Sequence, residues 1–474
     1  MSLKKQIAHN TILQIIGKII STALGLIALG MLTRYLGTEK YGWYTTTLAF
    51  LQFVGILIDF GLIPVSAQML GEAKFEKNKL FNNLFSYRFF SALIFLALAP
   101  LISLFFPYPT EVKIAIGFST ISFLSIALNQ ILVGNYQTKL KMLVQVIGEN
   151  IGRLFLVIGL YFLIKKQADF LPIMFLMVIS NLAYTAVMFI HTHLKEYKIR
   201  FSFDKTIWLA ITKKMWPVAI SIIFNVVYLK GDTLLLTFFS SQTEVGFYGA
   251  AYKVLDVLTQ TAMMLMGLFL PLLAFSWGQN LKQEFKERWQ LSFDAMMILA
   301  VPMTAGLYAL ADKTMFLIAG QNFAPAGQVL KILSLAIFGV YLGAIFGHSA
   351  VAINRQKETI KIYLISAIVT LIGYLIFIPK YGMYGAAWMS VFSEFFTGFG
   401  LYFIIKKYIK EKITLKTFYK IIFSSFIMIL FLNYFQNLNI FILVFIGIIV
   451  YSLMIIITKA VARETIWEIF NLKK

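Results

Sequence analysis

The chain has 474 residues, of which 59% are hydrophobic and 13% are charged, and its mean hydropathy is +0.80. A soluble domain is about 45–50% apolar and about 25% charged, so this composition excludes an ordinary soluble protein and indicates an integral membrane protein. The chain contains no cysteine, which excludes a disulfide framework and a thiolate nucleophile, and its four histidines show no paired metal-ligand spacing.

Fourteen apolar runs are long enough to be membrane-spanning helices, since one crossing takes roughly 20 mostly apolar residues. In chain order they lie near residues 11–33, 46–69, 84–106, 113–134, 144–164, 170–191, 215–239, 247–275, 291–311, 328–351, 359–378, 383–405, 419–435 and 440–458. The first run contains Lys18 and lacks a small-residue cleavage site, so we expect a retained helix rather than a signal peptide. The sequence therefore predicts an all-α integral membrane protein with about 14 transmembrane helices.

The distribution of lysine and arginine over the connecting segments predicts the orientation of the chain. Alternate segments that include both termini hold 29 of the 42 basic residues, the other connecting segments hold 7, and six lie within or at the edges of spans. We therefore expect both termini to be cytoplasmic, with the basic segments facing anionic membrane lipids. This placement accounts for the net charge of +21 without a nucleic-acid partner.

Long basic segments at 191–216 and 406–420 indicate the organisation of the chain. They predict an N-terminal six-helix lobe (1–195), a cytoplasmic linker (196–214), a C-terminal six-helix lobe (215–405) and a final helix pair with a cytoplasmic tail (406–474). Three stretches echo one another, namely EKYGWYTTTLAF (39–50), TEVGFYGAAYKV (243–254) and YGMYGAAW (381–388). Such repeats are typical of transporters built from two related bundles with the substrate between them, although small residues at a helix start also serve close packing alone.

Ten charged residues lie inside the predicted spans, namely Lys18, Asp59, Glu149, Arg153, Lys230, Asp232, Lys253, Asp256, Asp294 and Glu394. A charge at a helix centre that faces lipid costs about 2.5–3.5 kcal/mol, so ten would cost on the order of 25–35 kcal/mol. That sum exceeds the net stability of most folds. We therefore expect these side chains to face water or one another. Arg88 and Lys331 lie near span ends, where a long basic side chain can reach the interface.

Helical spacing indicates which way several polar residues face. The first span carries a continuous polar stripe of Asn10, Gln14, Lys18, Ser21 and Gly25. Shorter stripes occur in the second span (Gln52, Gly55, Asp59), the fifth (Gln145, Glu149, Arg153), the eighth (Lys253, Asp256, Gln260) and the twelfth (Ser390, Glu394). Polar faces on the first and second helices of both six-helix blocks predict a shared hydrated cavity.

The stretch NVVYLKGDTLLLTFF (225–239) places Lys230 and Asp232 in the seventh span. Residues two apart on a helix point about 200° apart, so these side chains do not pair with each other in a regular helix. We expect each to meet a partner on a different helix, with Lys253 or Asp256 as one partner set. Structural ion pairs, such as Asp232 with Lys253 or Glu149 with Arg153, are the alternative interpretation.

Five motifs occur in order along residues 5–405: TRYLGTEKYGWY (33–44), IDFGL (58–62), KGDTLLLTFFSSQTEVGFYGAAYKV (230–254), IAGQNFAPAGQVLKIL (318–333) and IPKYGMYGAAWMS (378–390). Together they resemble the motifs of Wzx-like polysaccharide repeat-unit (O-antigen) flippases. These proteins form a family of the multidrug/oligosaccharidyl-lipid/polysaccharide (MOP) exporter superfamily. The resemblance implies two six-helix lobes with helices thirteen and fourteen appended.

The resemblance also implies a function and a location. An undecaprenyl-diphosphate-linked oligosaccharide repeat unit would move from the cytoplasmic to the outer leaflet of the bacterial inner membrane by alternating access. The protein would be no enzyme and need no cofactor, but would couple transport to a proton or sodium gradient. A polysaccharide polymerase and a chain-length regulator would be its partners.

Candidate site residues follow from the embedded charges and the resemblance, which matches Lys18, Asp59, Lys230, Asp232 and Lys253. The cavity cations that would bind the diphosphate are Lys18, Lys230, Lys253 and Arg153. The coupling or counter-ion carboxylates are Asp59, Asp232, Asp256, Glu149 and Glu394. We predict no catalytic residue and no metal ligand.

Three other functions are weighed against the flippase. A multidrug or organic-cation antiporter of the same superfamily would require unpaired acidic residues, whereas this chain has embedded lysines and an extra helix pair. A membrane glycosyltransferase, polymerase or ligase would have a large outer loop, but the longest predicted here is about sixteen residues, around 312–327. A transport-inactive scaffold would not need polar stripes as costly as these.

Overall fold

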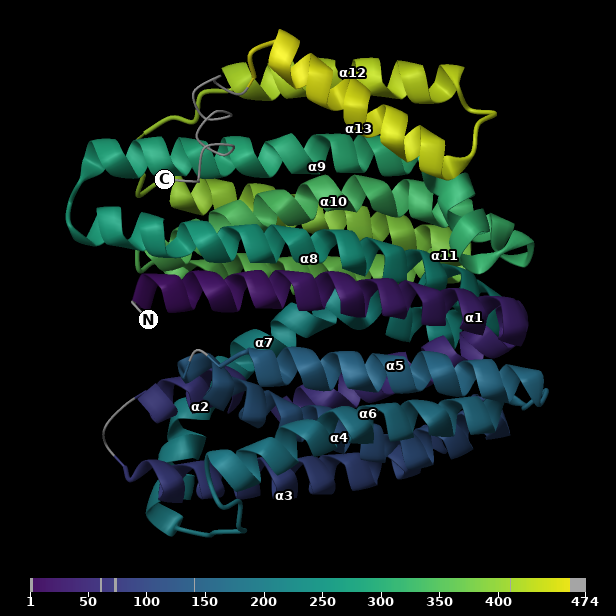
Figure 1. Ribbon diagram of the computed structural model, residues 1–474, viewed down its shortest axis with the longest axis vertical. Helices are drawn as coiled ribbons and strands as arrows, with labels where there is room; N and C mark the ends of the chain where they lie inside the picture. Colours follow the sequence, from purple (N-terminus) through teal and green to yellow (C-terminus); the bar gives the residue numbers. More distant parts are fainter. Residues whose placement is uncertain (1–2, 60–61, 72–74, 140, 410, 461–474) are drawn as a thin grey trace. The chain divides into compact units, whose positions relative to one another are not determined.

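The computed structural model describes residues 3–59, 62–71, 75–139, 141–409 and 411–460. These residues form helices joined by short connections (Figure 1). The helices are α1 (Leu3–Asp59), α2 (Leu62–Gly71), α3 (Lys77–Ser103), α4 (Thr110–Thr138), α5 (Leu143–Lys165), α6 (Phe170–Lys195), α7 (Lys205–Phe239), α8 (Gln242–Gly278), α9 (Lys282–Ala319), the 3-10 helix η1 (Gln321–Phe323), α10 (Ala324–Ala352), α11 (Gln356–Ile405), α12 (Lys416–Tyr434) and α13 (Ile440–Ile457).

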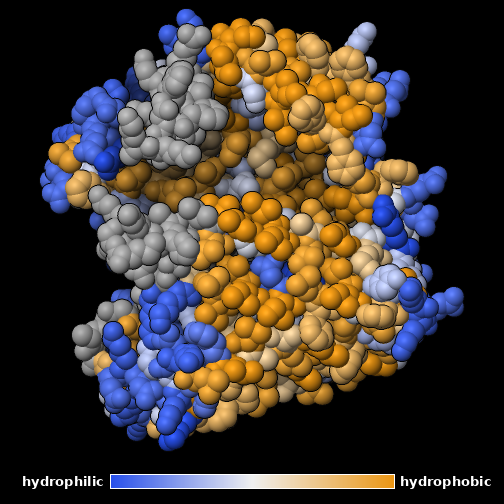
Figure 2. All heavy atoms as spheres, in the orientation of Figure 1, coloured by the Kyte–Doolittle hydropathy of each residue, from blue (hydrophilic) through white to orange (hydrophobic). Residues whose placement is uncertain are grey.

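Within the described residues, 11 helices are long and apolar enough to cross a membrane. Two of them, α1 and α11, have 57 and 50 residues and bend at a glycine, so each supplies two crossings. Helix α7 supplies another through its apolar run at 216–239. The described helices thus account for the fourteen crossings that the sequence predicts. Figure 2 shows hydrophobic side chains along the helices and hydrophilic ones gathered toward their ends.

The bends in α1 and α11 replace two of the connections that the hydropathy pattern predicts as loops. Gly37 has φ 70° and ψ −176°, and Gly382 has φ 53° and ψ −133°. Residues with a side chain rarely adopt a positive φ, because their Cβ crowds the backbone, whereas glycine has no Cβ. A single glycine therefore turns the chain between two crossings.

Gly37→Ala tests this explanation. A Cβ built on Gly37 would meet nothing within 4 Å, so the substitution changes backbone strain without creating a clash. We expect it to lower the free energy of unfolding by about 1–3 kcal/mol, measured as a lower melting temperature of the purified protein. The matched control is Gly117→Ala, which also has open space but lies inside α4. There we expect no loss, since alanine favours the helix. Equal melting of both variants would contradict the strain argument.

Contacts divide the chain into two compact units, Met1–Gly246 (unit 1) and Phe247–Lys474 (unit 2). In unit 1, α1 packs against α4, α5 and α7, and α6 packs against α4 and α5. In unit 2, α10 packs against α9 and α11, and α12 and α13 pack against α9. The division falls after Gly246 rather than in the linker because α7 contacts α1, α2 and α3. The six-helix lobes with their residue boundaries stay a prediction.

The connection before α7 is shorter than the linker expected at 196–214, because α7 already begins at Lys205. The Asp204 carboxylate accepts hydrogen bonds from the backbone N–H groups of Thr206 at 2.9 Å and Ile207 at 3.2 Å. An aspartate at this position satisfies N–H groups that have no partner inside the helix, and so fixes where the helix starts.

Ion pairs join the connecting segments of unit 1 at its two ends. At one end Lys79 lies 2.5 Å from Asp204, and Glu196 contacts Lys139 and, at 2.7 Å, Lys141. At the other end Lys40 lies 2.6 Å from Asp169. Segments predicted on the same side of the membrane thus lie together, as alternating crossings require. Which end faces the cytoplasm stays a prediction.

Candidate functional site

The polar stripe of the first crossing faces α5 at three of its five positions. The Ser21 hydroxyl donates to Oε1 of Glu149 at 2.7 Å, and Lys18 Nζ lies 3.8 Å from the same oxygen. Gly25 lies beside the Arg153 guanidinium, since a Cβ built on this glycine would be 3.8 Å from Nη1. We call Lys18, Ser21, Glu149 and Arg153 the cation strip. It brings three of the predicted site residues together.

Lys18 and Glu149 are accessible although they lie in membrane-spanning helices. Their side chains are 40% and 25% exposed. An exposed ion pair near the 4 Å limit contributes only about 0–1 kcal/mol. Lys18 is therefore held near α5 without being locked into a buried pair. Glu149 pairs with Lys18 of α1. Its spacing to Arg153 instead suggests an ion pair within α5.

Close packing at glycines sets the position of α5 in this strip. Val146 covers Gly17 so closely that a Cβ there would lie 2.2 Å from its side chain. The Asn150 side-chain amide donates to the Gly17 carbonyl at 3.3 Å. On the opposite face of α5, a Cβ on Gly152 would be 2.9 Å from the Ser180 carbonyl of α6. Helix α5 is therefore wedged between α1 and α6, which fixes the depth of Glu149 and Arg153.

The seventh crossing places Asp232 in the interior of unit 1. Its Oδ1 atom accepts from the Thr233 backbone N–H at 2.6 Å and from the Thr233 hydroxyl at 3.1 Å. The side chains of Lys230 and Asp59 lie outside the described residues, so their predicted roles stay predictions. The expected contact of Asp232 with Lys253 also stays a prediction.

In unit 2, Lys253 is exposed and Asp256 is half-buried on α8, and Glu394 is half-buried on α11. A Cβ on Gly339 of α10 would lie 2.8 Å from the Glu394 Cβ, so the two helices approach closely at this carboxylate. Ser390, which the sequence groups with Glu394 on one polar face, is instead buried. Its hydroxyl lies 3.1 Å from that of Tyr248 and 3.4 Å from that of Tyr374.

Arg88 is a residue whose role the sequence reasoning missed. The expectation that it reaches the interface is wrong, since its side chain is only 1% exposed. Its Nη1 donates to the Ile58 carbonyl at 2.8 Å, its Nε donates to the Ala127 carbonyl at 3.1 Å, and its Nη2 contacts Gln130. Arg88 thus joins the end of α1 to α4. Lys331, the other residue expected to snorkel, lies over the Tyr308 ring at 4.9 Å.

Sequence profiles of two families match the chain. The profile of the polysaccharide biosynthesis protein family matches residues 7–277, and that of the lipid II flippase MurJ family matches residues 178–453. Each match covers more than half of the chain.

Among curated relatives, a protein named as an O-antigen transporter from Shigella dysenteriae is 22% identical over 374 residues, which cover 78% of this chain and 92% of that protein. A protein named as the low-salt glycan biosynthesis flippase Agl15 from Haloferax volcanii is 25% identical over 162 residues. That second match spans only 34% of each chain.

Solved structures show the same fold. A lipid II flippase MurJ in an inward closed conformation superposes with a TM-score of 0.77 at 18% identity, covering 94% of this chain and 98% of MurJ. An inward-facing multidrug resistance MATE transporter of the MOP superfamily gives a TM-score of 0.68 at 11% identity, covering 84% and 98%. The fold is thus MurJ/MATE-like, and with a family profile that matches more than half of its length, the chain belongs to the polysaccharide biosynthesis protein family.

Proposed function

We propose that this protein is a flippase for lipid-linked polysaccharide precursors. In the finer form of the proposal, it moves an undecaprenyl-diphosphate-linked oligosaccharide from the cytoplasmic to the outer leaflet by alternating access. The observation that carries the proposal is the cation strip, in which Lys18 stays 40% exposed within a helix apolar enough to cross a membrane. The family match supports the transport class, and the strip supports an anionic headgroup as the cargo.

The chemistry of the strip suits a diphosphate. It holds two basic side chains, Lys18 and Arg153, and one carboxylate, Glu149, so its formal charge is positive. Lysine presents a compact point charge, whereas arginine presents a planar fork that matches two phosphate oxygens. The contact between Lys18 and Glu149 is loose, so an arriving phosphate can compete for the ammonium. Once released, Glu149 would be free to take up a proton or sodium ion, which is the coupling that we propose.

The same charge balance bears on the antiporter alternative. An organic cation requires an acidic site, but the carboxylate of the strip has a lysine beside it and a serine hydroxyl donating to it. The fold shared with MATE transporters is compatible with either cargo, because fold alone does not determine the substrate. We therefore favour the anionic lipid. We further propose that the protein lies in the bacterial inner membrane with both termini in the cytoplasm. We propose a polysaccharide polymerase and a chain-length regulator as its partners, and no catalytic activity.

Complementation of a bacterial strain that lacks its own O-antigen flippase tests the proposal. We expect Lys18→Ala and Lys230→Ala to reduce surface polysaccharide at least tenfold at normal protein levels. Lys18→Arg and Lys230→Arg should retain most export, since the positive charge remains. The readout is surface polysaccharide by gel, normalised to the protein in isolated membranes.

The matched control is Lys40→Ala. Lys40 also lies on α1 and contacts a carboxylate, Asp169, but this pair lies at the end of unit 1 away from the strip. Its loss should leave export unchanged. Full export by both alanine variants of Lys18 and Lys230 would refute the assignment of these lysines to the substrate.

A further inference from the structure

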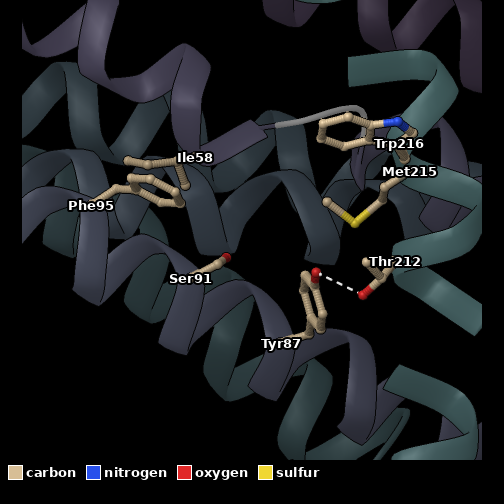
Figure 3. Close-up of a pocket in the computed structure, with 7 residues that line it drawn as sticks. All are labelled: Ile58, Tyr87, Ser91, Phe95, Thr212, Met215 and Trp216. Atoms are coloured by element: carbon tan, nitrogen blue, oxygen red, sulfur yellow. Dashed lines mark hydrogen bonds between the residues drawn. The ribbon is translucent and has the colours of Figure 1, made fainter. Parts of the chain in front are cut away.

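A cavity of about 180 Å³ lies between α3 and α7 within unit 1 (Figure 3). Its apolar lining comes from Ile58 of α1, Phe95 of α3, and Met215 and Trp216 of α7. We call it the α3–α7 pocket. An apolar cavity of about 150 Å³ stays dry and binds a molecule such as benzene. The α3–α7 pocket therefore has room for a short length of hydrocarbon chain.

Polar groups mark one side of the pocket. The Tyr87 hydroxyl of α3 and the Thr212 hydroxyl of α7 lie 3.1 Å apart and bridge the two helices there (Figure 3). The mouth is open, because Trp216 is 64% exposed and Thr212 is also exposed. Phe90 and Ile94 on α3 are exposed apolar side chains, as expected of a surface that faces lipid. Hydrocarbon can thus enter from the bilayer.

The connection that precedes α7 places this pocket near the membrane surface. Residues 196–204 lie along the first turns of α3. The Asn82 side-chain carbonyl accepts from the Arg200 backbone N–H at 3.1 Å, and that of Asn83 accepts from the Asp204 N–H at 2.8 Å. Tyr87 of α3 and Trp208 of α7 lie with their ring centroids 4.9 Å apart, and Tyr87 lines the pocket. Tyrosine and tryptophan prefer the depth of the lipid headgroups, so the pocket begins near that level.

The surroundings of the mouth are basic. Residues 195–216 contain six basic side chains, Lys195, Lys198, Arg200, Lys205, Lys213 and Lys214, against two acidic ones, Glu196 and Asp204. The hydrogen bond from Lys79 lowers the pKa of Asp204 below its ordinary value. Burial opposes ionisation of Glu196, but hydrogen bonds from Lys139 and Lys141 still lower its pKa. Both acids are thus ionised and already neutralised by lysines outside the segment, which leaves a positive surface.

Three basic residues are next to the lining in sequence, Arg88, Lys213 and Lys214; Arg88 is buried and Lys214 is half-buried, which leaves Lys213 as the exposed one. Lys213 precedes Trp216 by three residues and Thr212 precedes it by four, so helical spacing makes both of them neighbours of Trp216 on the α7 surface. Its side chain is exposed. A lipid whose chain enters the pocket would therefore have its headgroup beside an ammonium group, which favours a negative charge.

We propose that the α3–α7 pocket binds an acyl chain of an anionic glycerophospholipid, with the headgroup phosphate beside Lys213. This site is separate from the cation strip, and its occupant is a resident lipid rather than the transported cargo. The bound lipid would fill the space between α3 and α7 and hold the pocket side of α7 in place against α1.

Quenching of Trp216 fluorescence by lipids with brominated acyl chains tests the proposal in the purified full-length protein. The Trp216 signal is obtained as the difference between the wild type and Trp216→Phe. We expect brominated phosphatidylglycerol to reach half-maximal quenching at a mole fraction at least fivefold lower than brominated phosphatidylcholine. Lys213→Gln should reduce this preference at least threefold, whereas Lys113→Gln, at the opposite end of unit 1, should not change it.

Ser91→Leu fills the pocket from α3 and should abolish quenching by chains inside it. The melting temperature without added lipid shows whether this variant is folded, and Lys213→Gln changes only an exposed side chain, so the test does not depend on one variant. Equal quenching by both lipids would overturn the proposal, as would unchanged quenching in folded Ser91→Leu. Displacement of the brominated lipid by undecaprenyl phosphate at lower concentration than by phosphatidylglycerol would also overturn it, because the occupant would then be the cargo's tail.

Discussion

Arg88→Met is expected to lower the free energy of unfolding by about 3 kcal/mol or more. The guanidinium donates to the carbonyls of Ile58 and Ala127 and contacts Gln130 inside unit 1. Hydrogen bonds to charged groups contribute about 1.5–3 kcal/mol each. Methionine fills a similar volume but donates nothing, so these partners remain in a dry interior without the guanidinium. The expected result is a melting temperature several degrees lower and less protein in the membrane.

Two further variants test whether the hydrogen bonds of Arg88 matter, rather than its charge alone or the replacement of any arginine. Arg88→Lys keeps the charge, but one ammonium group does not match the planar fork that reaches partners on two helices, so we expect an intermediate loss. Arg200→Met removes an exposed arginine from the connection before α7 and should change stability by no more than about 0.5 kcal/mol. If Arg88→Met melts like the wild type, the claim that Arg88 fastens α1 to α4 is wrong.

Gly42→Ala is expected to separate two helix ends that now touch. A Cβ on Gly42 would lie 1.8 Å from the Gln242 carbonyl oxygen, and a Cβ on Gly246 would lie 2.3 Å from the Thr38 carbonyl oxygen. Both obstacles are backbone atoms, so no side chain can rotate away. The Thr46 hydroxyl lies 2.7 Å from the Gln242 side-chain oxygen in the same contact. Overpacking of this kind costs about 1–3 kcal/mol, and more where the backbone must move.

The measurements for Gly42→Ala are melting temperature and export in the complementation assay, where we expect at least a tenfold reduction. Gly267→Ala is the control, because Gly267 lies in α8 and a Cβ there would meet nothing within 4 Å. It should match the wild type in both measurements. Normal export and melting of Gly42→Ala would show that the contact tolerates a side chain and is not required.

The sequence predicted the crossings because hydropathy is a local property that each helix displays by itself. The same holds for the stripe on the first crossing, where helical spacing alone places Lys18, Ser21 and Gly25 on one face. The partner of that face was not predictable in this way. Glu149 contacts Lys18 from α5, and a contact between helices far apart in the chain depends on how they pack.

Two features were missed although the sequence carries a signal for them. Asp204 followed by Lys205 and Thr206 is an ordinary helix start, and α7 begins there, ten residues before the apolar span predicted at 215–239. Arg88 follows Asn82, Asn83 and Ser86, a polar cluster at the start of an apolar run. Asn82 and Asn83 bind the connection before α7, and Ser86 accepts from the Ser202 backbone N–H. That cluster indicates a buried polar face rather than a route to the interface.

The reciprocal approach of Gly42 and Gly246 has a consequence for how such sequences diverge. A side chain at either position would collide with the backbone of the opposite segment. A substitution at one position therefore cannot be compensated by a smaller residue at the other. Neither position can therefore accept another residue while the contact is kept. We expect relatives that keep this contact to have glycine at both positions, and relatives that have lost it to be free to change both.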